Sequence, residues 1–151
     1  MKVRFEQHSH DEMEVVVRAL KQDSAVTSVM NYVASFDAQS KIMVVDKEKD
    51  RQIMLTFAEI TAVQVTAELL QIYLKDGRKI AVRERLYKFQ AQLDQRFVQI
   101  SKNTIVNLYS LQQLTVHFGQ VMAEMESGEA FAVSRRYVKK LKEALEVLTH
   151  G

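Results

Sequence analysis

The sequence has no cysteine and no proline, and only four of its 151 residues are glycine. Without cysteine, the chain can form no disulfide framework, no cysteine nucleophile and no thiolate metal site. Without proline, it has no Pro-rich linker. The glycines are too scattered to form a P-loop or a G-x-G-x-x-G dinucleotide-binding segment. They stand at Gly77, Gly119, Gly128 and Gly151.

Long apolar runs are also missing. The longest run drawn only from Ala, Val, Ile, Leu, Met and Phe is four residues. A helix that crosses a bilayer needs about 20 mostly apolar residues, so no segment is predicted to insert into a membrane. The first residues contain no apolar core of signal-peptide length. We therefore expect a cytoplasmic protein.

The sequence shows no catalytic or metal-binding set. It lacks the G-x-S-x-G and S-x-x-K motifs of serine-dependent enzymes. His8 and His10 offer two nitrogens without a third ligand, which is a poor metal site. Glu124 and Glu126 share one face of an alternating strand, and solvent exposure explains them better than paired catalytic carboxylates. We predict that the chain is not an enzyme and needs no cofactor or metal.

The net charge is only +2, but it is unevenly distributed. Residues 51–110 contain nine Lys and Arg against five Asp and Glu. In the last third of the chain, all five cations fall between Arg135 and Lys142. A local basic surface is what phosphate binding requires, because neutralised phosphates release counterions. The alternative interpretation is a solvated helix face.

Residues 1–41 are predicted to form a small β-β-α unit. Lys2–Glu6 alternates polar and apolar residues, and Val15–Val17 is β-branched, so both stretches favour strands. Apolar residues then recur on one helical face, after Asp23 or Ser24 as N-cap. These residues are Val26, Val29, Met30, Val33 and Phe36. The unit is too small to be stable alone, so we expect it to pack on the rest of the chain or on a second copy.

The stretch from residue 42 to residue 133 consists of short strands without the βαβ alternation of a parallel sheet. Strands are expected at 42–45, 51–55, 61–66, 69–74, 78–82, 97–100, 105–106, 111–118, 121–126 and 130–133. Asp76–Gly77 is a type I′ hairpin signal, and Gly119–Gln120 suits a second tight turn. Helices are expected at 84–93 and after Ser134. The predicted fold class is therefore mainly β (α+β overall), an antiparallel fold with short flanking helices.

Two stretches place cationic or amide side chains beside short apolar anchors. In Phe97–Asn107, a short strand is followed by a polar triplet and then by an apolar pair that ends in asparagine. In Ser134–Leu141, two arginines and two lysines stand at the expected start of the last helix. Each stretch alone is also compatible with a solvated surface, and Asn103 with an ordinary turn residue.

These stretches resemble the signature segments of LytTR-type bacterial DNA-binding domains. The hairpin from Phe118 to Met125, the turn at Gly128 and the segment from Val133 match the C-terminal end of that family in order and spacing. The resemblance covers about residues 42–148, so it implies a DNA-binding domain over 42–151. The N-terminal unit, residues 1–41, resembles the lead segment of stand-alone regulators in this family, and we expect it to serve dimerisation.

The resemblance implies a sequence-specific transcriptional regulator that reads duplex DNA through loops and the start of the last helix. Carried over onto this chain, the DNA-binding residues are Ser101, Lys102, Asn103, Arg135, Arg136, Lys139 and Lys140. Arg136 or Arg135 can bond guanine O6 and N7, and Asn103 can pair with adenine. Asn107 is expected to be structural. A further family surface falls at 66–69, where the Glu68 carboxylate would be repelled by phosphate, so we expect no major contact there.

The resemblance also implies protein partners. We expect a homodimer and, by analogy with stand-alone regulators, a regulatory partner protein at the membrane. The alternative function is a protein-interaction or ligand-sensing module that has the same fold but does not bind DNA.

Overall fold

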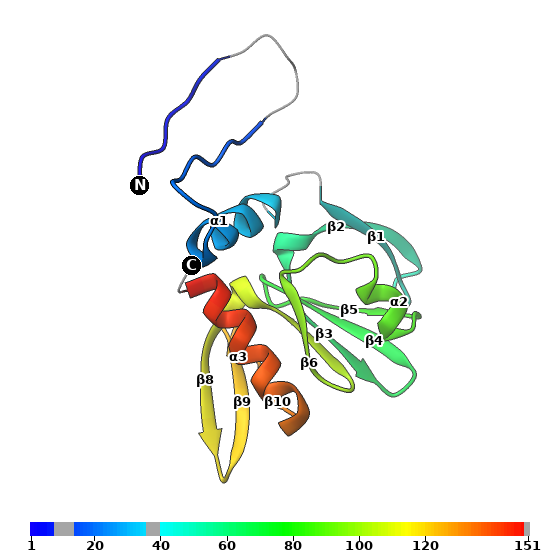
Figure 1. The fold of residues 1–151 in the computed structure, drawn as a ribbon. Coiled ribbons are helices and arrows are strands. Elements are labelled where there is room, and N and C mark those ends of the chain that lie inside the picture. Colours follow the sequence, from blue (N-terminus) through cyan, green and yellow to red (C-terminus); the bar gives the residue numbers. More distant parts are fainter. Residues whose placement is uncertain (8–13, 36–39, 150–151) are drawn as a thin grey trace.

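The computed structural model describes residues 1–7, 14–35 and 40–149. Within these ranges the elements, in chain order, are α1 (Ser24–Ser35), β1 (Lys41–Asp46), β2 (Arg51–Thr56), η1 (Phe57–Glu59), β3 (Ile60–Thr66), β4 (Leu69–Leu74), β5 (Lys79–Val82), α2 (Leu86–Gln90), β6 (Phe97–Ser101), β7 (Thr104–Asn107), η2 (Leu108–Ser110), β8 (Leu111–His117), β9 (Gln120–Met125), β10 (Ala130–Val133) and α3 (Arg135–Thr149) (Figure 1). Every strand pairing is antiparallel. The predicted fold class is confirmed.

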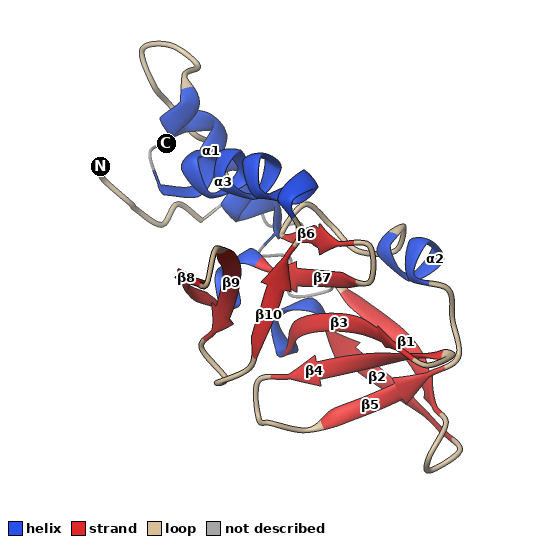
Figure 2. Cartoon of the chain, turned by 90° about the horizontal axis from the view of Figure 1, so that it is seen from below, coloured by secondary structure: helices blue, strands red, loops and turns tan. Residues whose placement is uncertain are grey.

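A five-stranded sheet with the order β5-β4-β3-β7-β6 is the framework of the molecule (Figure 2). Successive residues of a strand point to opposite faces, so neighbouring apolar residues enter different cores. In β3, Ala62 joins one buried cluster and Val63 joins the other. Ile105 and Val106 of β7 divide in the same way. Both faces of the sheet are therefore covered.

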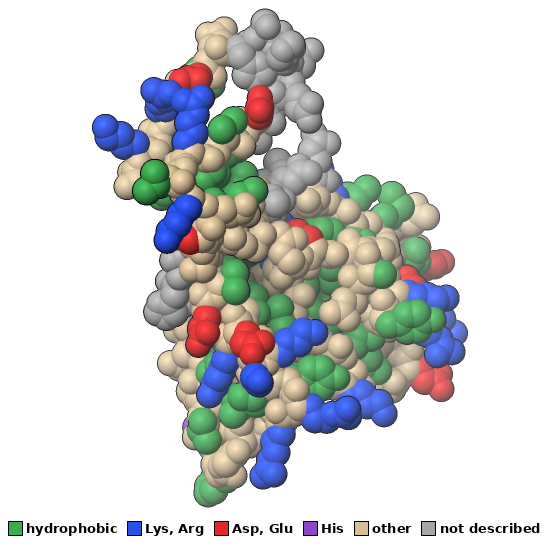
Figure 3. Space-filling view, viewed as in Figure 1, with side chains coloured by type: hydrophobic (Ala, Val, Ile, Leu, Met, Phe, Trp, Pro, Cys, Tyr) green, Lys and Arg blue, Asp and Glu red, His purple; other side chains and the backbone are tan. Residues whose placement is uncertain are grey.

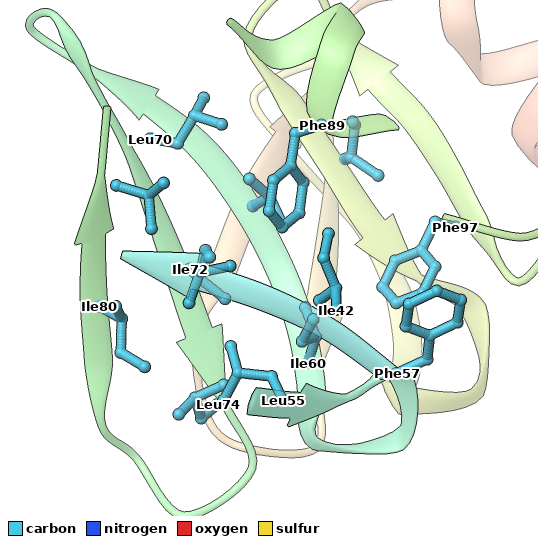
Figure 4. Close-up of a cluster of buried hydrophobic side chains, with 14 residues drawn as sticks. Ile42, Leu55, Phe57, Ile60, Leu70, Ile72, Leu74, Ile80, Phe89 and Phe97 are labelled. Atoms are coloured by element: carbon cyan, nitrogen blue, oxygen red, sulfur yellow. The ribbon is translucent and has the colours of Figure 1, made fainter. Parts of the chain in front are cut away.

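The β1–β2 ribbon, η1 and α2 cover the first face. Ile42, Leu55 and Phe89 converge there with Ile72 of the sheet (Figure 4). Phe57 meets Phe97 edge to face, with ring centroids 5.8 Å apart. The alternating burial of β1 shows that the ribbon lies on the sheet with one side only.

A three-stranded sheet with the order β10-β9-β8 and helix α3 cover the second face. Phe131 of β10 packs edge to face on Tyr73 of β4, with ring centroids 5.1 Å apart. The last helix presents one apolar face to this cluster, where Leu141 is buried. Further partly buried residues of the helix pack around it, namely Tyr137, Val138, Ala144, Leu145 and Leu148.

The two N-terminal strands of the predicted β-β-α unit are wrong. Residues 1–7 and 14–20 are described, and they form no strand. Val3, Phe5 and Val16 lie exposed to solvent. An isolated two-stranded hairpin is at best marginally stable, and neither stretch pairs with a strand of the described chain. The predicted helix is confirmed as α1, with Asp23 accepting the Val26 N–H at 3.1 Å, while Phe36 lies outside the described residues.

The first predicted turn has a different geometry. At Asp76–Gly77 only the glycine has positive φ, 89°, so the turn is not type I′. Leu74 accepts the Gly77 N–H and donates its own N–H to Arg78, both at 3.0 Å. This is a type I turn closed by a glycine bulge. Asp76 stabilises it by accepting from the Arg78 backbone and side chain, and these bonds lower the pKa of its exposed carboxyl.

The second predicted turn is displaced by one residue. His117 pairs with Gln120, so Phe118 and Gly119 are the two loop residues, with φ values of 51° and 78°. A two-residue loop with positive φ at both positions is the type I′ geometry. The sequence pattern favoured Gly119–Gln120 because glycine normally occupies such a position, whereas phenylalanine rarely does.

Candidate nucleic-acid interface

The polar triplet forms the turn between β6 and β7. Ser101 Oγ accepts the backbone N–H of Asn103 at 3.2 Å and so caps this turn. The Asn103 carbonyl accepts the Val65 N–H at 2.9 Å, which ties the turn to β3. The side chains of Lys102 and Asn103 are exposed, and Ser101 is half-buried. The backbone is thus held on the sheet while two polar side chains project into solvent.

The start of α3 lies directly beside this turn. The Ser134 N–H donates to the Ile100 carbonyl at 2.9 Å, so the residue before Ser101 is bonded to the residue before Arg135. The carbonyl of Ser134 accepts the Tyr137 N–H at 2.9 Å as the helix begins. Buried Val133 and Ile100 anchor the junction in the second core. The two stretches singled out in the sequence therefore form one continuous surface.

The cations of the helix start project away from the core. Arg135, Arg136, Lys139 and Lys140 are all exposed. Side chains four positions apart lie on one helix face, so Lys139 follows Arg135 and Lys140 follows Arg136. Figure 3 shows Lys and Arg side chains over the lower part of the molecule, around the start of α3. Within the described ranges, none of these four side chains forms an ion pair with a carboxylate.

The turn between β3 and β4 reaches the same end of the sheet. The Val65–Asn103 hydrogen bond places the end of β3 beside the Ser101–Asn103 turn, and Thr66 to Leu69 follows at once. Ala67 has a φ of 56°, and Glu68 is exposed. The third surface is therefore close to the other two, but its charged side chain is a carboxylate. The expectation that this turn makes no major phosphate contact stays a prediction.

Polar side chains stabilise the β3–β7 framework that carries the surface. Asn107 Nδ2 donates to the Ile60 carbonyl at 2.9 Å, and its Oδ1 accepts the Tyr109 N–H at 3.0 Å. The structural role expected for Asn107 is confirmed. Gln64 donates to Thr104 Oγ1 at 3.1 Å and joins β3 to the base of the triplet turn.

Two further residues that stabilise the fold around the hairpins were not singled out from the sequence. Gln120 Nε2 donates to the Val133 carbonyl at 2.8 Å and ties the β8–β9 hairpin to the residue before Ser134. Buried Arg96 bonds Asp94 through Nε and Nη2 just before β6 and lies over the Phe57 ring, with Cζ 5.6 Å from the ring centroid. The Gln120–Val133 and Arg96–Phe57 contacts have no local signal because folding brings their residues together, whereas Arg96 bonds an aspartate only two positions away.

The chemistry of this surface suits a phosphate backbone and base edges. Guanidinium groups can bind phosphate or guanine in a bidentate manner, and the ammonium of Lys102 acts as a point charge. The free N–H groups and the positive dipole end of the fifteen-residue α3 add a further attraction for anions. Among the described residues, no group of three His, Asp or Glu side chains could hold a metal ion. None of the described helices is long and apolar enough to cross a membrane.

Three comparisons relate the chain to known proteins. Residues 50–146 match the family model described as the LytTr DNA-binding domain. Two uncharacterized HTH-type transcriptional regulators from Staphylococcus aureus are each 28% identical to the chain over 138 residues, which covers 90% of this chain and 91% of each relative. A solved LytTr DNA-binding domain from Bacillus cereus has a similar fold, with a TM-score of 0.62, 17% sequence identity, and coverage of 72% of this chain and 98% of that chain.

Proposed function

This chain belongs to the family of LytTr DNA-binding domains, and from that premise we propose that it is a transcriptional regulator that reads a specific duplex sequence. Its reading surface is the Ser101–Asn103 turn together with the first two turns of α3. The supporting observation is the hydrogen bond from Ser134 N–H to the Ile100 carbonyl, which joins the two stretches. DNA recognition needs cations and base-reading side chains on one rigid surface, and this bond supplies the rigidity.

The surface is built from turns and a helix end. Although the Staphylococcus aureus relatives are named for a helix-turn-helix, no two consecutive elements in the described part of this chain are both helices. Arg136 and Arg135 lie at the N-terminus of α3, where one can read guanine while the other holds phosphate. Lys102, Lys139 and Lys140 neutralise phosphates, Ser101 donates its hydroxyl to a phosphate, and Asn103 reads adenine.

A selection experiment tests this function. The full chain is used to select binders from a random duplex library, and affinity for the recovered sequence is then followed against salt. The triple variant Lys102→Ala, Arg135→Ala, Arg136→Ala should bind more weakly. The slope of log affinity against log salt should become less negative by about 2–3, because up to three phosphate contacts disappear.

A variant with the same charge loss at the opposite end of the sheet is the control. The control variant combines Lys75→Ala, Arg78→Ala and Lys79→Ala, and it removes three cations around the β4–β5 turn. This turn lies beside the start of β3, whereas the reading surface lies beside the end of β3. This variant should keep the parent affinity and salt slope. If both triple variants bind DNA alike, the proposed reading surface is wrong. If no sequence is enriched, a protein-interaction or ligand-sensing module becomes the better function.

The function has consequences for location and partners. A regulator of transcription acts in the compartment that holds the DNA, so we infer a cytoplasmic protein in a bacterial cell, without a catalytic role. We also propose a homodimer in which the N-terminal segment contributes to the interface. Val3 and Phe5 expose 88% and 87% of their surface in the single chain, which suits side chains that are covered by a second copy. Regulation by a partner protein at the membrane is proposed by analogy with stand-alone regulators.

A further inference from the structure

The tip of the β8–β9 hairpin carries a phenylalanine in a strained conformation. Phe118 has a φ of 51°, a left-handed backbone that bulky side chains rarely adopt. Asparagine or glycine is the usual choice at this position of a type I′ turn. The ring is fully exposed, at 108%, so packing within the chain does not offset the strain. A strained residue that gains nothing from its own fold is a reason to look for a ligand.

The tip is fixed relative to the start of α3. Val121 pairs with Val133, and the Gln120 side chain donates to the Val133 carbonyl at 2.8 Å. Phe118 and Gly119 lie further out along the hairpin than this anchored position. The loop therefore projects about 7 Å past the end of β10, which is the length of two strand residues. In Figure 1 the β8–β9 hairpin extends beyond the start of α3 on the side where that helix begins. The tip therefore lies on the side of the molecule where α3 begins with Arg135 and Arg136.

The tip carries no Lys, Arg, Asp or Glu side chain between Val116 and Val121. Val116 is 67% exposed, and His117 and Gly119 complete the loop region. The hairpin thus presents a narrow apolar end next to a cationic surface. Interfaces with proteins usually need a broad apolar patch, whereas a single apolar side chain flanked by phosphate-binding cations matches the wedges that enter the minor groove of DNA.

We propose that Phe118 is an apolar wedge that inserts between two base pairs in the minor groove, next to the groove segment contacted by the start of α3. Partial unstacking of that base step kinks the duplex and brings more backbone against the cations. The proposal rests on the proposed DNA-binding function and adds a contact site and a DNA deformation to it. Pyrimidine–purine steps unstack most easily, so the wedge also favours such a step at a fixed distance from the bases read by Arg136.

The Phe118→Asn variant separates the wedge from the fold. Asparagine tolerates positive φ, so this variant should fold at least as stably as the parent, with an equal or higher Tm. With the duplex recovered by selection, it should lose most of the bend reported by energy transfer between dyes at the two duplex ends. Its affinity should fall about tenfold, and the salt slope should become shallower than that of the parent, because the unbent duplex brings less backbone against the cations.

Two further variants sharpen the test. Phe118→Leu should retain most of the bend, because leucine also serves as a wedge. Tyr87→Ala, which removes an exposed aromatic from α2, should leave bend and affinity at parent values. A 2-aminopurine base placed at successive steps should brighten at one step with the parent chain and stay dim with Phe118→Asn, because unstacking relieves its quenching.

The outcomes distinguish the wedge from the proposed DNA-binding function. If the parent chain binds the selected duplex and Phe118→Asn binds and bends it equally, the wedge is wrong and the DNA-binding function stands. Loss of a protein partner by Phe118→Asn, with DNA binding and bending unchanged, would show that the tip docks a protein and would also overturn the wedge. If the parent chain selects no duplex, the proposed function fails first.

Discussion

At the residue scale, two asparagines of the β6–β7 hairpin have the same side chain but different environments. Asn107 is buried and bonded on both sides, to the Ile60 carbonyl at 2.9 Å and to the Tyr109 N–H at 3.0 Å. Asn103 is exposed in the turn at the other end of β7. The first therefore belongs to the framework, whereas the second projects into solvent.

This difference gives a stability prediction. Asn107→Ala leaves the fully buried Ile60 carbonyl without its side-chain partner and should lower the free energy of unfolding by about 2 kcal/mol. Asn103→Ala removes an exposed side chain and should change it by less than about 0.5 kcal/mol. Urea denaturation of both variants measures the two values. Equal losses would mean that Asn107 does not carry the structural role assigned to it.

At this scale, residue types were easier to predict than residue environments. The polar triplet and the arginine pair could be singled out because each stands beside a turn or a helix start in the sequence. That they meet depends on the Ser134–Ile100 hydrogen bond between segments far apart in the chain, which no local pattern encodes. The exposed Phe118 was missed for the opposite reason, because a local rule assigned the turn to the following glycine.

At the scale of elements, the strands of the central sheet were well predicted. β4 and β10 begin and end at the expected residues, because turn residues bound them on both sides. The N-terminal strands were wrong although Lys2–Glu6 alternates in the same way. Alternation shows that a stretch suits a sheet, but a strand forms only where a neighbouring strand pairs with it. α1 formed because a helix satisfies its own backbone and needs only one surface to pack on.

The packing of α1 leads to a prediction about its dynamics. α1 contacts α3 and η2, where Tyr32 meets Tyr109 edge to face with centroids 5.4 Å apart, yet Met30 and Tyr32 keep about half of their surface exposed. So little burial implies a low opening free energy. Backbone amides of α1 should exchange with deuterium faster than those of β3, and Tyr109→Ala should accelerate exchange in α1 further while β3 is unchanged. Protection of α1 equal to that of β3 would contradict this.

At the scale of the whole molecule, the chain has an asymmetric surface. The reading surface lies at one end of the central sheet, while most of the exposed large apolar residues lie on the N-terminal segment, on α1 and on the outer side of the β1–β2 ribbon, with Val116 and Phe118 at the β8–β9 tip as exceptions. The ribbon exposes Met43 and Met54, which pair across its two strands. The charge distribution along the sequence showed where cations gather in the chain, but not which of them lie at the same end of the fold. The position of the reading surface follows from the strand order, which places the β6–β7 turn beside the end of β3.

This asymmetry defines two rival dimer interfaces and a final prediction. If the N-terminal segment holds the dimer, Val3→Ser with Phe5→Ser should convert the chain to a monomer, because burial of apolar surface drives association. Static light scattering at micromolar concentration measures the mass. Met43→Ser with Met54→Ser is the matched control, since it removes a similar amount of exposed apolar surface from the β1–β2 ribbon.

Each result then has one interpretation. Loss of the dimer mass only in the N-terminal variant supports the proposed interface. Loss only in the ribbon variant moves the interface to the β1–β2 ribbon, and a monomer mass for the parent chain removes the homodimer altogether. A dimer held at the N-terminal segment leaves both reading surfaces free, so the duplex recovered by selection should then contain two copies of one half-site. The two-fold symmetry of the protein would be repeated in the DNA.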